Sequence, residues 1–486
     1  MNKYIKRHCN LGSRSLYVTN DSDIKYKNIN DMLDEKKSYT IQSSSILSFM
    51  MKNYIIGDET IIKGIKKEKW FHDQNNFTGE NTPNILPSHG RLELTNEEIG
   101  DKLRLLLLDE ARYFLNGKKT IGLLLSGGMD SRVVAGIIRE LQENGEFLGD
   151  VVALTWGIET TRDVIYSRRI AKKFNWEHKH FKLNSETLIK NIYITAERGA
   201  EYSPLHLHAM SDISKLSGLD GILAGSYGDS VGRAEFSGKK VQSINSLLND
   251  DFNKFALLNS RIKKENLPFL IDEIDSYHKC FSRESLWEYY EIDRQCHYMR
   301  RQLGACMDII DDNIPLYQMF TDISVFGFMW SLSPKCRTDS IYTEVLKKLP
   351  GDLLTIPWAR DGKLYPGQGE VCDNIEASHN LYGIWLRTEC STVIENAIYS
   401  GALESLNIFN PYTLSRLKHY WKKSKSNGAD RFDERISWMA SLSLLVEKYN
   451  IKSEYFSNND YKEYLFSLKG YTYSTFYRNA RHILKK

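Results

Sequence analysis

The sequence predicts an α/β fold, in which a doubly wound parallel sheet follows a short mixed unit and precedes a largely helical part. Apolar runs of strand length occur at residues 120–125, 151–156, 178–183 and 221–224, with helical patterns between them. Strands that alternate with helices in this way form parallel sheets with right-handed crossovers. Before about residue 100 the chain shows short strand and turn signals, and after about residue 240 few strand signals remain.

The other elements follow in chain order. Loop signals lie at Asp58-Glu59 and at residues 75–87. A helix is predicted over 97–115, where one apolar stripe contains Ile99, Leu103, Leu106, Leu107, Ala111 and Phe114. Further helices are predicted at 130–141, at 162–174, twice within 185–216, and at 246–261, 283–304 and 435–449. We expect domains at 1–95, 96–370 and 371–486.

The composition is that of an ordinary soluble protein. The formal charge of +3 over 486 residues gives no argument for nucleic acid. No apolar run approaches the roughly 18 residues of a membrane-spanning helix, and the polar N-terminus shows no signal peptide. Seven cysteines without a CxxC pair indicate reduced thiols. We therefore expect a cytoplasmic protein with no membrane span and no nucleic-acid partner.

The segment after the first predicted strand carries the most chemical information. It reads Ser126-Gly127-Gly128-Met129-Asp130-Ser131 and stands between a strand and a helix. At such a turn, backbone N–H groups and the helix dipole attract phosphate, and glycines let the phosphate come close. A carboxylate beside phosphates is repelled unless it holds a cation, so Asp130 predicts Mg²⁺ shared with the phosphates. An ordinary strand-to-helix turn is the alternative.

A second loop, after the fourth predicted strand, contains Gly225 and Asp229. Ligands of parallel sheets bind beyond the carboxyl ends of the strands. This rule gathers both loops and Thr155 at one edge. We expect Asp130 and Asp229 to hold one Mg²⁺, and the backbone near Leu125 and Thr155 to lie against an adenine ring.

The string SGGxDS resembles the pyrophosphate loop of the ATP pyrophosphatases, which cleave ATP between the α- and β-phosphates. Together with residues 223–232 (LAGSYGDSVG), it resembles the synthetase domain of asparagine synthetases, β-lactam synthetases and lasso-peptide cyclases. The resemblance extends loosely over about residues 40–370. It implies a sheet of the ATP pyrophosphatase type, the use of ATP and Mg²⁺, adenylation of a carboxylate with release of pyrophosphate, and transfer to a nitrogen nucleophile.

The resemblance also implies roles for individual residues. The nucleotide-binding set is Leu125, Ser126, Gly127, Gly128, Asp130, Ser131, Thr155 and Gly225, and the metal ligands are Asp130 and Asp229. The family has a catalytic Lys in a loop after a Leu-Pro pair, where this chain has Arg360 and Lys363. Arg360 could act only through its charge, because a guanidinium does not titrate at neutral pH. Asp311 falls at the position of the family's acidic residue two places before the Arg of its R-x-P-F-L-D segment.

Some positions depart from the family pattern. Glutamine-using members carry Cys after the initiator Met, whereas this chain has Asn2, and Cys9 is not equivalent. We therefore expect no glutamine hydrolysis, and nitrogen from ammonia, a separate donor protein or the acceptor itself. Ser226 replaces the family's Glu or Tyr and leaves Tyr227 as the substitute acid–base group.

Several alternatives remain open. Asn313 and Gln318 replace the Arg and Asp of the family's R-x-P-F-L-D segment, which is compatible with a nucleotide-binding protein that has lost catalysis. A macrolactam-forming peptide cyclase and a tRNA-modifying pyrophosphatase are further alternatives, the latter disfavoured by the small net charge. The carboxylate belongs to a small acid, a sugar acid or a peptide. His206 or His208 is a candidate for the substrate side, and the basic segment 469–486 favours a helix packed on the core.

Overall fold

The computed structural model describes residues 16–19, 22–69, 72–73, 85–233, 238–249, 253–367, 369–424, 426–457 and 460–484. Asn2, Cys9 and most of the predicted loop at 75–87 lie outside these ranges. Within them, no helix combines the length and apolar character needed to cross a membrane.

A five-stranded parallel sheet forms the centre of the α/β part. Its strands are β7 (Thr120–Leu124), β8 (Asp150–Gly157), β9 (Glu177–Lys182), β10 (Ile222–Ala224) and β11 (Leu316–Gln318). The order is β11-β10-β7-β8-β9, and all four pairings are parallel. The four predicted strands and the predicted fold class are confirmed. The sequence did not predict β11, because three residues are too few for a periodicity.

The strand order reverses between β7 and β10. From β7 the chain adds β8 and β9 on one side, and later adds β10 and β11 on the other side. The two loops that follow β7 and β10 therefore diverge from neighbouring strands. This is the switch point at which open parallel sheets bind ligands.

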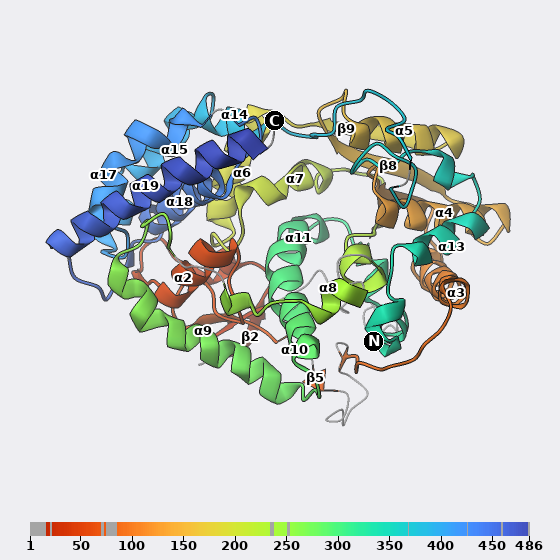
Figure 1. Cartoon of the computed structure of the whole chain (residues 1–486), viewed down its shortest axis with the longest axis horizontal. Helices are drawn as coiled ribbons and strands as arrows, with labels where there is room; N and C mark the ends of the chain where they lie inside the picture. The colour runs from red at the N-terminus through yellow and green to blue at the C-terminus, as the bar shows by residue number, and fades with distance from the viewer. Residues whose placement is uncertain are drawn as a thin grey trace.

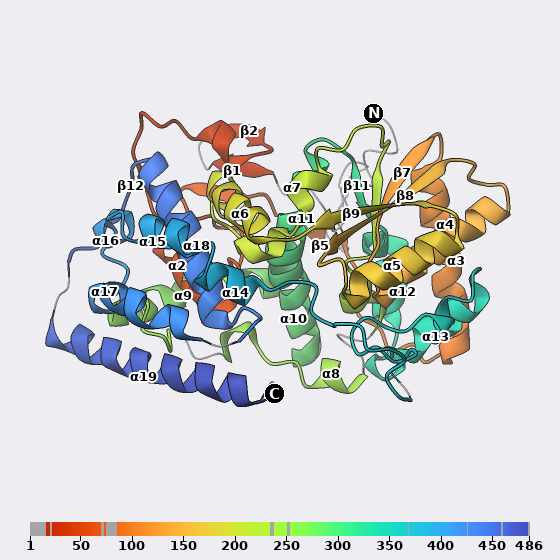
Figure 2. The same ribbon diagram turned by 90° about the horizontal axis from the view of Figure 1, so that it is seen from above.

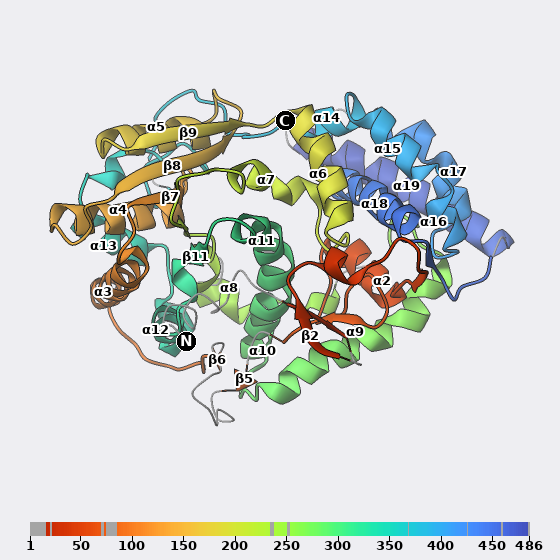
Figure 3. The ribbon, with the colours of Figure 1, turned by 180° about the vertical axis from the view of Figure 1, so that it is seen from behind.

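Helices cover both faces of the sheet. Alternate strand residues point to opposite faces, so that Leu123 and Ala153 belong to one apolar core and Leu124 and Leu154 to another. The first core includes residues of α3 (Asn96–Leu115), α4 (Met129–Glu143), α5 (Arg162–Lys173) and α13 (Ser340–Lys348). The second includes residues of α6 (Ser185–Glu197), α7 (Met210–Ile213) and α11 (Ala305–Asp311). Figure 3 shows this arrangement around the sheet.

Local sequence explains where the main helices begin. A capping box opens α3, because Thr95 Oγ1 accepts from the backbone N–H of Glu98 and the Glu98 carboxylate accepts from that of Thr95. Such a box satisfies two otherwise unpaired donors at a helix start. Asn184 caps α6 by accepting from the backbone N–H of Thr187 at 2.9 Å. Helices α3, α4 and α5 confirm the predictions at 97–115, 130–141 and 162–174.

The helix predicted at 246–261 is wrong. Among the described residues from 246 to 259, only η6 (Leu247–Asn249) is helical, and α9 (Ser260–Cys280) begins after them. Asn253 and Ala256 have positive φ angles of 59° and 50°, which a right-handed helix cannot contain. The Asn253 side chain also bonds both backbone groups of Leu258 and so fixes a turn. The predictions at 283–304 and 435–449 fall on helical segments, α10 (Leu286–Asp293) with η7 (Arg294–Gly304), and α18 (Arg431–Lys448).

The C-terminal part is helical, as predicted. Besides α18 it contains α14 (Tyr382–Arg387), α15 (Ser391–Ile398), α16 (Ala402–Ser405), α17 (Pro411–Tyr420), η11 (Trp421–Lys423) and α19 (Tyr461–Leu484). The shorter helices before it are η3 (Pro204–Leu207), η4 (Gly228–Gly232), α8 (Gly238–Gln242), η8 (Met319–Thr321), α12 (Ile323–Ser331), η9 (Pro334–Cys336) and η10 (Leu353–Thr355).

The N-terminal unit packs against the C-terminal helices. Its elements are β1 (Tyr17–Thr19), β2 (Ser22–Tyr26), η1 (Ile29–Met32), β3 (Tyr39–Thr40), α2 (Ser43–Lys52), β4 (Ile65–Lys67), β5 (His72–Asp73) and β6 (Ile85–Leu86). Strand β3 pairs with β12 (Ile451–Lys452), and Phe49 of α2 stacks on Trp438 of α18 at 4.0 Å. Figures 1 and 2 show α2 of this unit beside α9 and α18, away from α3 and α4.

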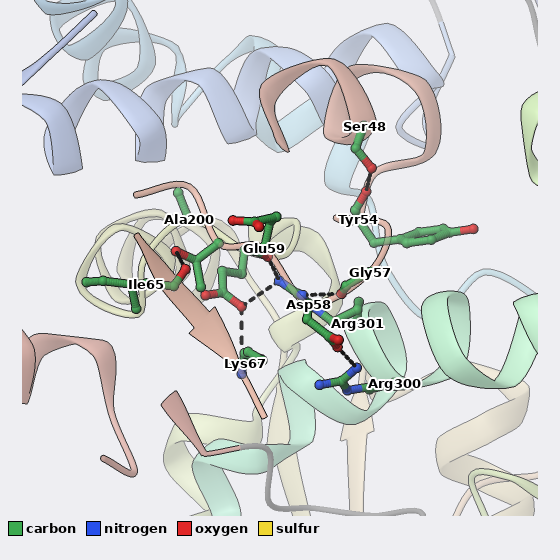
Figure 4. Close-up of polar contacts among 12 residues, drawn as sticks. Ser48, Tyr54, Gly57, Asp58, Glu59, Ile65, Lys67, Ala200, Arg300 and Arg301 are labelled. Atoms are coloured by element: carbon green, nitrogen blue, oxygen red, sulfur yellow. Dashed lines mark hydrogen bonds and ion pairs between the residues drawn. The ribbon is translucent and has the colours of Figure 1, made fainter. Parts of the chain in front are cut away.

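Buried ion pairs join the N-terminal unit to the rest of the chain (Figure 4). Arg301 of η7 donates to the carbonyls of Gly57 and Glu59, and lies 3.0 Å from the Glu201 carboxylate. Arg300 pairs with Asp58 at 2.5 Å. Because a buried charge is costly without a partner, these pairs hold residues 57–59 in one position against η7.

Candidate active site

The two predicted loops meet at the switch point. A Cβ atom on Gly225 would lie 2.8 Å from the carbonyl carbon of Asp130, and one on Gly228 would lie 2.5 Å from Asp130 Oδ1. Both separations are shorter than real Cβ contacts. The second loop therefore reaches Asp130 only because these positions lack side chains.

Internal hydrogen bonds shape the glycine loop. Ser126 Oγ accepts from the Gly128 N–H, and Ser131 Oγ accepts from the Ser126 N–H, both at 3.1 Å. The Gly127 N–H donates to Asp163 Oδ1 at 3.1 Å. Gly128 is the N-cap of α4, so the loop ends at the positive end of that helix dipole.

Arg132 ties this loop to a second segment, and the sequence analysis assigned it no role. Its guanidinium is fully buried and donates to the carbonyls of Gly127, Leu353, Ile356 and Pro357 at 2.5–3.1 Å. Burial lowers the pKa of Arg132 to about 9. The signal was its place one residue beyond the SGGMDS motif.

The segment tied by Arg132 leads into the loop that carries Arg360 and Lys363. The Ala359 N–H donates to the Gly127 carbonyl at 3.2 Å. Arg360 is exposed, and its guanidinium carbon lies 5.2 Å from the Trp358 ring centroid. Lys363 is half-buried. The structure thus brings the backbone of the predicted cation loop onto the glycine loop.

Arg233 lies between the two predicted metal ligands. Its Nε and Nη2 donate to Asp130 Oδ1 and Oδ2 at 3.2 and 3.1 Å, and Nη2 also lies 2.9 Å from Asp229 Oδ1. Its Nη1 donates to Asp339 Oδ1 at 2.8 Å. The Arg233 side chain is only 2% exposed, whereas that of Asp229 is 52% exposed.

The electrostatics follow from this arrangement. Burial raises the pKa of Asp130 to about 6. The charge of Arg233 opposes this rise, and the charge of Asp229 adds to it. Burial by itself would lower the pKa of Arg233. The charges of Asp130 and Asp229 outweigh this effect and raise the Arg233 pKa well above its ordinary value. Three carboxylates around one guanidinium leave the cluster negative.

The donor set does not fit Mg²⁺ between Asp130 and Asp229 as these side chains stand. Arg233 already engages both oxygens of Asp130 and one oxygen of Asp229. Mg²⁺ requires oxygen ligands at about 2.1 Å, so it would need the same lone pairs. Among the described residues, no group of three or more His, Cys, Asp or Glu side chains has a metal-binding arrangement.

The structure buries the side chains of two predicted catalytic residues. Tyr227 is fully buried, and its hydroxyl donates to the Met299 carbonyl at 3.4 Å. Burial, and then Asp308, raise its pKa well above the ordinary value, so it is a poor proton shuttle. Asp311 accepts from the Leu316 N–H at 3.0 Å, at the amino end of β11. It therefore lies at the edge of the sheet opposite the two loops.

Replacements of family residues have different surroundings. Gln318 ends β11 on the side of the loops, and it and Ser226 both donate to Met307 Sδ, at 3.4 and 3.3 Å. Gln318 Oε1 is buried, with no hydrogen-bond partner among the described residues. Asn313 is exposed and precedes β11.

Leu125 and Thr155 lie beneath the glycine loop. Thr155 is buried, and its Oγ1 donates to the Leu125 carbonyl at 2.6 Å. The Leu125 N–H donates to the Leu154 carbonyl at 2.9 Å. These bonds join the ends of β7 and β8. The contact of this backbone with adenine stays a prediction.

A cluster of rings adjoins the end of β8. His208 stacks on Trp156 and donates to or accepts from the Tyr382 hydroxyl at 2.8 Å, and its ring centroid lies 5.6 Å from that of His379. His208 has φ 44° and ψ −123°, a strained backbone conformation. Burial, and then His379 and His206, lower the His208 pKa well below its ordinary value. The sequence suggested His208 and missed His379 and Tyr382, which lie in a loop and a short helix without a motif.

Residues 102–287 match the asparagine synthase family. This chain contains an asparagine synthetase-like domain. Among curated proteins it is similar to the glutamine-hydrolysing asparagine synthetase of Gallus gallus, with 29% identity over 96 residues. That match covers 20% of this chain and 17% of the relative, so the chain spans less than a fifth of the relative's length. The family match supports an ATP-using synthetase domain.

Solved structures show weaker likenesses. They include a predicted tRNA methyltransferase subunit of Methanocaldococcus jannaschii, with 19% identity and a TM-score of 0.17 over 26% of this chain and 61% of that one. The U34-tRNA thiolase of Methanococcus maripaludis has 14% identity and a TM-score of 0.19 over 45% and 77%. The NMN synthetase of Francisella tularensis has 14% identity and a TM-score of 0.20, over 45% of this chain and 93% of that one. TM-scores this low do not establish a shared overall fold.

Proposed function

We propose that this protein is an ATP-dependent ligase that adenylates a substrate carboxylate and passes the acyl group to a nitrogen nucleophile. One observation carries the proposal. The SGGMDS loop and the loop at 225–229 pack on each other at the switch point of a parallel sheet, within a domain that matches asparagine synthase.

The reaction has two balanced steps. A carboxylate oxygen of the substrate attacks the α-phosphorus of ATP, and pyrophosphate leaves. The nitrogen nucleophile then attacks the acyl carbon, AMP leaves with the electron pair of the broken C–O bond, and the nitrogen loses a proton. Such chemistry depends chiefly on positioning and on stabilising charge.

The glycine loop is the proposed phosphate site. Its set is Leu125, Ser126, Gly127, Gly128, Asp130, Ser131, Thr155 and Gly225. Support comes from its place at the start of α4 and from the two serine hydroxyls that brace it. Because Gly127 donates to Asp163, a phosphate bound at that N–H would replace a carboxylate already accommodated there.

Arg360 and Lys363 are the proposed cations for the departing pyrophosphate and the tetrahedral intermediate. Their loop contacts the glycine loop through Ala359 and Gly127. Arg360 acts by charge alone, whereas Lys363 is also able to carry a proton. No step is assigned to Tyr227, whose hydroxyl bonds the Met299 carbonyl in the interior, or to Asp311, which lies at the amino end of β11.

The proposed substrate is a small or sugar carboxylic acid, and the proposed nitrogen source is ammonia, delivered freely or by a separate protein. A peptide that cyclises is the alternative substrate within the same family. The proposed domain boundaries remain 1–95, 96–370 and 371–486. Of these, the central one contains the whole of the family match.

The test is pyrophosphate release from ATP with a panel of small acids, sugar acids and peptides, each with ammonia, glutamine or neither. We expect AMP and pyrophosphate in equal amounts with one acid class, dependence on ammonia but not on glutamine, and a loss of at least 100-fold in Asp130→Ala. ADP and phosphate as products, or full activity of Asp130→Ala, would contradict the proposal.

The second candidate function is nucleotide binding without catalysis. It is favoured by the salt bridges of Arg233 to Asp130 and Asp229, and by Gln318 in place of the family's Asp. ATP binding measured by calorimetry, together with no pyrophosphate from any acid, nitrogen source or divalent metal, would establish this candidate in place of the ligase.

A further inference from the structure

The side chain of Arg233 occupies a position built to hold one cation. Its guanidinium carbon lies 5.0, 5.5 and 5.9 Å from the ring centroids of Tyr342, Trp358 and Tyr365. Aromatic faces attract cations at these distances. The rings come from α13 and from the loop after η10, so elements distant in sequence enclose one guanidinium.

The surroundings hold the carboxylates as well as the cation. Tyr365 donates its hydroxyl to the Asp339 carbonyl at 2.7 Å and lies 3.2 Å from Asp339 Oδ1. A Cβ on Gly232 would lie 2.4 Å from the Tyr342 hydroxyl, so Tyr342 packs tightly against the residue before Arg233. The pairing is therefore part of a packed site and not a surface contact.

We propose that Arg233 is a resident counter-cation that keeps free divalent metal ions off Asp130 and Asp229 in the nucleotide-free protein. Mg²⁺ and the guanidinium compete for the same carboxylate oxygens and repel each other. A metal reaches this pair only when Arg233 leaves it. The inference concerns the site of the proposed function, but it holds or fails independently of any ligase reaction.

The same geometry indicates which change frees the site. Replacement of Arg233 by Met keeps an unbranched chain that packs between the rings but removes the charge. Asp130 and Asp229 then keep their oxygens without a competing cation, and carboxylate oxygens are the ligands that Mg²⁺ and Mn²⁺ prefer. Arg233→Lys keeps the charge and so keeps the competition.

The experiment measures Mn²⁺ binding by electron paramagnetic resonance, without nucleotide, on the full chain. We expect Arg233→Met to bind Mn²⁺ at least tenfold more tightly than the wild type or Arg233→Lys. The added Asp130→Asn change should abolish this gain. Arg169→Met is the matched control, since Arg169 is exposed and pairs with Asp373 outside the cluster, and its Mn²⁺ affinity should equal that of the wild type.

Equal Mn²⁺ affinity in folded Arg233→Met and wild type would overturn the inference. If Arg233→Met fails to fold, a comparison of Mn²⁺ binding by the wild type and by Asp130→Asn still tests the inference. Wild-type Mn²⁺ binding at micromolar concentrations that Asp130→Asn removes would overturn it, and the absence of such binding would support it. Pyrophosphate release is measured separately, so failure of the ligase proposal leaves these outcomes unchanged.

Discussion

Asp130 and Asp229 have different surroundings although both contact Arg233. The Asp130 side chain is 21% exposed and both its oxygens accept from the guanidinium, whereas Asp229 is half-exposed. Burial therefore raises the pKa of Asp130 to about 6.

The glycine at position 225 is required by space and not by its backbone angles. We expect Gly225→Ala to weaken ATP binding by at least tenfold, because its Cβ would lie 2.8 Å from the Asp130 carbonyl group and would push the loops apart. Calorimetric titration with ATP measures the effect. The matched control is Gly327→Ala in α12, whose nearest neighbour would lie at 3.7 Å, and it should bind ATP normally.

Tyr227 contributes to stability and not to proton transfer. Tyr227→Phe removes its hydrogen bond to Met299 and should cost about 1 kcal/mol of unfolding free energy. Pyrophosphate release should change by less than about threefold, because the hydroxyl bonds the Met299 carbonyl in the interior. A 100-fold loss of activity with a changed pH profile and unchanged stability would restore the catalytic role.

At the scale of elements, buried ion pairs connect helices whose own sequences do not indicate which segments they pack against. Glu291 of α10 pairs with Arg337 after η9 and with His89, and it is fully buried. Burial alone would raise the pKa of Glu291, but Arg337 and His89 outweigh it and hold the pKa at about 2. The ionised carboxylate therefore joins α10 to two distant segments.

This depressed pKa makes stability depend on pH. Because the folded pKa lies below the unfolded value of about 4.5, the stabilisation is complete above that value and is lost as the pH falls towards 2. The linked free energy is about 3 kcal/mol. Glu291→Gln should flatten the decline of urea-unfolding stability below pH 4.5.

The control for this decline is Glu454→Gln, since Glu454 is 68% exposed in its pair with Lys63. It should leave the pH dependence of stability as in the wild type. An identical decline in Glu291→Gln and wild type would show that other carboxyl groups cause it.

At the scale of the whole molecule, buried charges join the N-terminal unit to the rest of the chain. Glu201 is 1% exposed and pairs with Arg301 at 3.0 Å and with Lys67 of β4 at 3.7 Å. Apolar residues of α2, α6 and α18 belong to one continuous core. Both features connect residues before 95 to the rest of the chain.

Glu201→Ala should lower the unfolding free energy by about 3–5 kcal/mol, because it leaves Arg301 and Lys67 buried without their carboxylate. Glu454→Ala breaks an exposed pair that also joins the N-terminal unit to the C-terminal part, and should cost at most about 1 kcal/mol. Thermal and urea unfolding of both variants measure the difference. Equal costs would show that burial does not decide the strength of this junction.

The sequence by itself determined four of the five strands of the sheet, because these strands and the three helices between them have clear apolar patterns. It also determined the two loops, because glycine and carboxylate positions carry local signals. It also supplied the nucleotide-binding residues as a hypothesis that the loop geometry supports.

Only the tertiary structure decided which charged groups meet. Tyr227 lies within a predicted loop, yet its hydroxyl bonds Met299 in the interior, and Asp311 lies at the opposite edge of the sheet because β11 runs parallel to β10. Arg233, Asp339 and Arg132 entered the site through long-range contacts. Periodicity predicts which face of an element is buried. It does not predict which residue a long polar side chain contacts, because that contact depends on how distant elements pack.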